Sequence, residues 1–169
     1  MTKKILTAAI AAACAIALTA GAAEAGDGGR TTIAMSLVPD FAVPVSCPEP
    51  EFGFALGVFS LGGRALGTGR TCIASSDGCD PFVAFCRRTV RATITLDLVR
   101  GSLTVPTKLL ELLPTESSFI QAGRGEVRAG TGAYAAAKGH LTGGGAGAFD
   151  EQFAFTGRLV YVAELRGVR

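Results

Sequence analysis

The chain lacks the residue patterns that mark several common enzyme classes. It has one histidine, His140, so no pair of histidines is present to bind a catalytic metal ion. No Gly-x-Ser-x-Gly elbow occurs, and the glycines at residues 62–69 lack the Gly-Lys-Ser/Thr ending of a phosphate loop. We therefore expect no metal site and no cofactor, and the sequence leaves open whether the protein is an enzyme.

Charge of one sign and long apolar runs are also scarce. Without Lys3, Lys4 and Glu24, the 16 basic and 14 acidic side chains become 14 and 13, and no basic run stands out. Nucleic-acid binding therefore has no electrostatic support. Only one long apolar run is present, at the N-terminus, so we expect no membrane span in the mature protein.

The N-terminal run has the layout of a secretory signal peptide. Lys3 and Lys4 precede an apolar stretch at residues 5–20, and Ala23-Glu24-Ala25 offers a small-x-small cleavage site before Gly26. We predict that residues 1–25 are removed, which leaves 144 of the 169 residues. The short, alanine-rich signal looks bacterial, so the expected location is secreted or periplasmic.

Four cysteines remain after cleavage, and in an exported domain they most simply form two disulfides. Sequence leaves three pairings open among Cys47, Cys72, Cys79 and Cys86. A zinc site is the alternative, but there is no Cys-x2-Cys knuckle and His140 lies far away in the sequence. We therefore predict two disulfides, with Cys79 and Cys86 in a loop at residues 74–86 that follows Cys72.

Prolines divide the mature chain into two parts. Residues 26–50 contain Pro39, Pro44, Pro48 and Pro50, which predicts an irregular N-terminal arm that Cys47 ties to the rest. From residue 51 onwards, short apolar runs alternate with glycine-rich turns, which is typical of an all-β domain over residues 51–169.

Several strands can be placed within that domain by the alternation of apolar and polar residues. Residues 89–99 alternate most strictly, which predicts one buried and one wet face. Residues 106–114 lie between two prolines and favour a short helical plug or a crossing loop over a further strand. Other expected elements are strands at 52–61, 64–73, 103–105, 138–142 and 149–163, a hairpin of residues 117–122 and 125–129, and a glycine turn at 143–145.

These elements predict a single eight-stranded antiparallel β-barrel with a disulfide-bearing loop and an irregular N-terminal arm. Eight strands can close a barrel whose interior is filled by side chains or holds one small ligand. The sequence does not decide between these two interiors.

One motif connects the chain to a known family. Gly130-Thr131-Gly132-x-Tyr134-x-x-Ala137-x-Gly139 resembles the glycine motif of dirigent proteins and allene oxide cyclases, and still more that of secreted bacterial proteins with the same barrel. The resemblance is close over residues 128–163 and only architectural over 51–127. It implies a tight turn, an aromatic cap on the core, and association into oligomers. The acidic catalytic residues of the family have no aligned positions here.

Five residues are candidates for a site. Tyr134, Phe153, Phe155 and Tyr161 would line a ligand cavity if the barrel is hollow, and would be core if it is filled. If the strand is regular, Glu151 points to the same side as Phe153 and Phe155, because the three residues are spaced two apart. Burial there would raise the pKa of its carboxyl and suit it to act as a general acid or base. The alternative is that Glu151 begins the strand and reaches solvent at the barrel rim.

Three hypotheses for function follow. The preferred one is a module that binds a small apolar ligand in or at the mouth of the barrel. The resemblance implies an alternative, a cyclase or a dirigent-type protein that guides a reactive intermediate in an apolar cavity. The third is a structural envelope protein whose barrel is packed solid.

Overall fold

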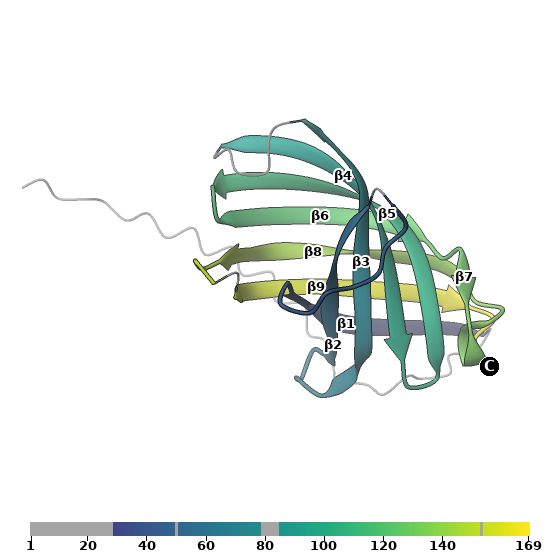
Figure 1. Cartoon of the computed structure of the whole chain (residues 1–169). Helices are drawn as coiled ribbons and strands as arrows, with labels where there is room; N and C mark the ends of the chain where they lie inside the picture. The colour runs from purple at the N-terminus through teal and green to yellow at the C-terminus, as the bar shows by residue number, and fades with distance from the viewer. Residues whose placement is uncertain (1–28, 50, 79–84, 153) are drawn as a thin grey trace, which may run out of the picture.

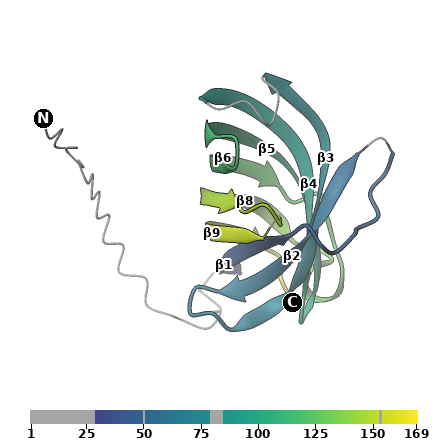
Figure 2. The same cartoon turned by 60° about the vertical axis from the view of Figure 1, so that its left-hand side comes forward.

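The chain folds into a closed, antiparallel β-barrel (Figures 1 and 2). The computed structural model describes residues 29–49, 51–78, 85–152 and 154–169. Its long strands are β1 (Arg30–Asp40), β2 (Phe52–Ser60), β3 (Ala65–Gly78), β4 (Cys86–Leu98), β5 (Gly101–Thr115), β6 (Ser118–Glu126), β8 (Lys138–Phe149) and β9 (Phe155–Arg166). They pair in the order β4-β3-β2-β1-β9-β8-β6-β5, and β4 pairs with β5 to close the sheet. The predicted eight-stranded barrel is therefore confirmed.

One half of the barrel is packed with apolar side chains. These inward residues alternate with outward polar ones, as on β5, where Leu103 and Val105 are buried. The largest fully buried side chains are Tyr161, Met35, Leu37, Leu96, Leu103, Leu141 and Leu165. This core fills the end of the barrel at which β5 begins.

The N-terminal segment is more regular than predicted. Residues 30–40 form β1, which lies between β2 and β9, so the prediction of an irregular arm over 26–50 is wrong for this part. Met35 and Leu37 point into the core in alternation with Ser36, and Pro39 falls next to the end of the strand. Within the described part of the arm, the irregular segment is residues 41–49, which follow β1. The predicted signal peptide, residues 1–25, lies outside the described residues.

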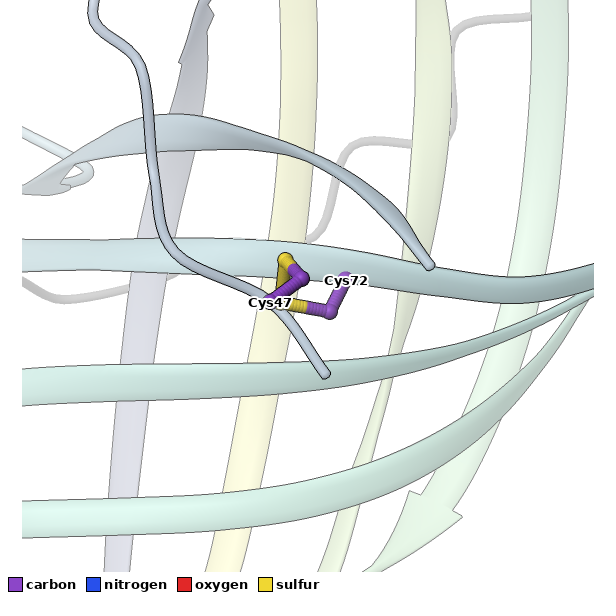
Figure 3. Close-up of a disulfide and its surroundings, with 2 residues drawn as sticks. All are labelled: Cys47 and Cys72. Atoms are coloured by element: carbon purple, nitrogen blue, oxygen red, sulfur yellow. A yellow bond between two sulfur atoms is a disulfide. The ribbon is translucent and has the colours of Figure 1, made fainter. Parts of the chain in front are cut away.

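A disulfide holds that irregular segment against the barrel wall (Figure 3). Cys47 on the segment is bonded to Cys72 on β3, with 5.7 Å between the Cα atoms. A side chain at Gly53, the residue that pairs with Cys72, would collide with the Cys47 sulfur. One predicted disulfide is thus confirmed and its partners are known. Cys86 is also disulfide-bonded, and Cys79 lies outside the described residues.

Strand β5 runs without interruption from Gly101 to Thr115, so the helical plug or crossing loop expected at residues 106–114 is wrong. Pro106 is exposed and falls where β5 changes partner, from β7 (Ala129–Gly130) to β6. The missing N–H therefore lies at a break between two pairings, a place where a strand tolerates proline.

Two glycine-rich segments are strands and not turns. β6 passes straight through Gly123, and β8 passes straight through residues 143–145. On β8, Cβ atoms built on Gly143 and Gly147 would meet the rings of Tyr161 and Phe155, which reach over from β9. Gly143 and Gly147 thus leave room for aromatic rings of the neighbouring strand, whereas Gly123 leaves room for the Leu109 side chain of β5. The turn predicted at residues 143–145 and the hairpin predicted across Gly123 are therefore wrong.

The motif at residues 130–139 closes the packed end of the barrel. Gly132 has φ = 56° and begins the short 3-10 helix η1 (Gly132–Tyr134). The Thr131 hydroxyl oxygen accepts a hydrogen bond from the Ser102 N–H at 3.0 Å, and Tyr134 is buried in the core. The tight turn and the aromatic cap that the motif implied are both present.

Candidate functional site

The other half of the barrel is hollow. A cavity of about 470 Å³ lies inside it, at the end where β5 finishes. Its floor is the packed core, because Leu37, Leu56, Ile94, Leu159 and Tyr161 belong to both. A space of this size falls within the range of small-molecule sites in proteins.

Aromatic rings form much of the cavity wall. Phe41, from the disulfide-tethered segment, stacks on Phe54 with ring centroids 4.4 Å apart and meets Phe149 edge-on at 4.8 Å. Phe149 in turn stacks with Phe119 at 5.5 Å. These four rings, which we call the mouth cluster, link the tethered segment to β2, β6 and β8. Phe41 therefore forms part of the cavity wall although it comes from outside the strands.

A row of polar side chains crosses the inner face among these apolar residues. Arg88, Glu111 and Gln121 lie directly opposite one another on β4, β5 and β6. The Arg88 Nε lies 2.7 Å from Glu111 Oε2, and both side chains are largely buried. The Gln121 amide donates a hydrogen bond to the hydroxyl of Tyr161 at 2.9 Å. The four residues form a polar patch, Arg88–Glu111–Gln121–Tyr161, within a mostly apolar space.

Burial keeps the Tyr161 phenol neutral. It raises the pKa of Tyr161 to about 12, against a lowering by the hydrogen bond from Gln121, and the nearby Glu111 carboxylate raises this pKa further. The hydroxyl accepts a hydrogen bond from Gln121, so its proton remains to be donated within the cavity. Tyr161 is therefore a hydrogen-bond donor at every physiological pH.

This shift predicts a loss of stability in alkali. The folded-state pKa of Tyr161 lies above its ordinary value of 10, so the stabilisation is complete below pH 10 and is lost as the pH rises to about 12. In a Tyr134→Phe variant Tyr161 is the only tyrosine left. We expect the near-ultraviolet phenolate absorbance of the folded variant to appear at about pH 12. Ionisation near pH 10 would instead mean that Tyr161 is open to solvent.

The predicted ligand-binding residues have different fates. Tyr161 lines the cavity. Phe155 is not part of the lining but packs behind it, 5.6 Å from Phe149 and 6.1 Å from Phe119. Tyr134 lies at the opposite, packed end, where burial raises the pKa of its phenol. Phe153 lies outside the described residues.

Glu151 is exposed outside the strands, as the second of its two predicted positions required. The predicted strand at residues 149–163 begins too early, because β8 ends at Phe149 and β9 begins at Phe155. Asp150 accepts hydrogen bonds from the N–H groups of Gln152 and Ala154 and so holds a turn between them. Glu151 is exposed in this turn and does not line the cavity.

Tyr161 was identified from the sequence, but the other three residues of the polar patch and the mouth cluster were missed. Glu111 shares the inward parity of Leu109 and Leu113, so a strand prediction over residues 106–114 would have identified it as a buried acid. Gln121 falls within the predicted strand at residues 117–122, but Phe119 and Ile120 are both apolar, so the pattern does not decide which face is inward. Phe41 gave no signal, since its place depends on a disulfide whose pairing the sequence leaves open.

The described residues contain no candidate metal site and no helix suited to cross a membrane, and their single histidine is paired with a glutamate. Within them, no group of three or more His, Cys, Asp or Glu side chains could hold a metal ion. His140 forms a half-exposed ion pair with Glu164 on β9, with 2.9 Å between Nε2 and Oε2. No helix in the described part of the chain is long and apolar enough to cross a membrane.

Comparison with family models, with curated proteins and with solved structures finds no match to this chain. The eight-stranded antiparallel barrel therefore rests on the structure itself. Membership of the allene oxide cyclase and dirigent families stays a prediction from the motif at residues 130–139.

Proposed function

We propose that this protein is an exported barrel that holds one small, mostly apolar ligand in the cavity behind the mouth cluster. The observation that supports the proposal is the cavity itself, about 470 Å³ of space inside a closed sheet, walled by phenylalanines and crossed by one polar patch. Burial of an apolar ligand there would be driven by the hydrophobic effect, and the polar patch would orient it. The cavity favours a ligand-holding role over a barrel packed solid.

Export is part of the same proposal. The signal-like pattern ahead of Gly26 directs the chain to the periplasm or the extracellular space. The Cys47–Cys72 disulfide supports this location, because disulfides persist in oxidising compartments and are rare in the cytosol.

A second candidate function is catalysis by guidance, as in a cyclase or a dirigent-type protein. The observation that favours it is the buried carboxylate of Glu111, held by Arg88 inside an apolar cavity. A site of this kind acts by positioning a reactive intermediate and excluding water. Such an activity would change the connectivity of the ligand, whereas a binding protein would release it unaltered.

Native mass spectrometry of the protein purified from its natural host tests the proposal. We expect a chain that begins at Gly26 and carries a non-covalent adduct, which leaves on denaturation. Chromatography of the released molecule against the one supplied separates binding from cyclisation. Absence of any adduct, from both the host protein and protein exposed to apolar extracts of that host, would contradict the proposal.

A matched pair of variants assigns the adduct to the cavity. Thr71 is buried and lines the cavity on β3, so Thr71→Trp would place an indole ring in the ligand space. Thr95 on β4 faces the opposite way from Ile94, so Thr95→Trp adds the same ring to the outer face. We expect the adduct to be lost with the first change and kept with the second. An adduct that survives Thr71→Trp lies elsewhere.

A further inference from the structure

The charges inside the cavity indicate which class of ligand it takes. In the described part of the lining, the charged side chains are Arg88, Glu111 and Glu116. Glu116 is exposed, whereas Arg88 and Glu111 are largely buried and bonded to each other at 2.7 Å. Among the described residues, the interior therefore holds one positive and one negative charge, and these are paired with each other.

A ligand that carries a charge would find no partner in this interior. A carboxylate would have to compete with Glu111 for the Arg88 guanidinium, and an ammonium group would have to compete with Arg88 for the Glu111 carboxylate. Each would lose its hydration without gaining a free counter-charge, which is costly in an apolar space. The ion pair thus acts against ligands of either sign.

The rest of the polar patch suits an uncharged group. The Tyr161 hydroxyl accepts a hydrogen bond from the Gln121 amide at 2.9 Å and keeps its own proton to donate. The side-chain carbonyl of Gln121 is an acceptor beside it. A carbonyl oxygen of a ligand can accept from Tyr161, and a ligand hydroxyl can also donate to Gln121.

We infer that the Arg88–Glu111 pair makes the cavity selective for uncharged apolar molecules that carry a hydroxyl or carbonyl group, against carboxylates and amines of the same carbon skeleton. This inference rests on the proposed ligand-binding function. Glu111 acts here as a specificity determinant, through the charge that it cancels on Arg88.

The test is displacement of a neutral apolar probe, N-phenyl-1-naphthylamine, from the purified protein by 1-decanol, 2-decanone, decanoate and decylammonium. We expect the alcohol and the ketone to displace the probe at concentrations at least about tenfold lower than the two ions. Equal displacement by decanoate or by decylammonium would overturn the inference. Failure of the probe and of all four ligands to bind would instead refute the proposed function.

Two charge variants should each shift the preference towards one of the ions. Glu111→Gln leaves Arg88 without its carboxylate, so decanoate should gain about tenfold or more relative to decanol. Arg88→Gln should favour decylammonium in the same way, and it serves if the first variant does not fold. Glu116→Gln at the exposed rim is the control and should leave the order of ligands unchanged. The inference would be overturned if decanoate gained nothing in Glu111→Gln and decylammonium gained nothing in Arg88→Gln.

Discussion

Replacing Cys47 and Cys72 together by alanine is expected to lower the free energy of unfolding by about 3 kcal/mol. The two cysteines are 25 residues apart, so their bond closes a loop that the unfolded chain would otherwise sample freely. Urea denaturation followed by circular dichroism measures the effect. Mutation is preferable to a reducing agent, because Cys86 is also disulfide-bonded and reduction would break both links.

The same double variant should loosen the aromatic end of the cavity. The bond fixes the segment that brings Phe41 against Phe54 and Phe149, and without it those ring contacts must hold the segment alone. We expect faster release of the bound probe from the variant than from the unaltered protein. If the free energy of unfolding of the variant lies within about 0.5 kcal/mol of that of the unaltered protein, the segment is held by its packing and not by the disulfide.

Changing Gly143 to alanine is expected to destabilise the barrel by about 2–3 kcal/mol. The added methyl group would lie 2.7 Å from Cδ1 of Tyr161 and would also collide with the Val160 carbonyl of β9. Because backbone atoms are involved, the strands must shift to relieve the contact, and Tyr161 would move with them. Urea denaturation of the variant gives the loss, and the probe titration shows whether the cavity floor has changed.

Gly62→Ala is the matched control. Gly62 lies in the turn after β2, where the nearest atom to an added Cβ is the Ser60 hydroxyl oxygen at 3.9 Å. This variant should stay within about 0.5 kcal/mol of the unaltered protein. Equal stability of the two variants would show that β8 does not need a bare inner face at Gly143.

The alternation of apolar and polar residues along the chain was enough to predict most of the strands. Residues 89–99 alternate so strictly that β4 was predicted almost in full, and the turn at Gly130-Thr131-Gly132 gave the aromatic cap. The strands missed or broken were those with proline or glycine in their interior. The local preference is for a turn at Gly123 and Gly143 and for a helical plug or a loop at Pro106, and only pairing and packing with neighbouring strands override it.

The candidate site depended far more on tertiary structure. Sequence parity placed Tyr161 on the inner face but placed Glu151 there too, because parity holds only within one unbroken strand. The turn at Asp150 interrupts the strand, so the alternation of inward and outward residues along β9 does not extend back to Glu151, which is exposed. Glu111, Arg88 and Gln121 come from three strands and meet only because the barrel closes through the pairing of β4 with β5.

The sequence by itself determined the all-β class, the eight-stranded antiparallel barrel, the cysteine pool for disulfides and the cap at Tyr134. Each was predicted from patterns among residues near one another in the chain, such as apolar alternation, glycine turns and the spacing of cysteines. Only the tertiary structure decided that the barrel is hollow at one end and that a buried ion pair crosses the cavity. A cavity exists where side chains from distant strands fail to fill the space between them, and that volume depends on strand register and closure.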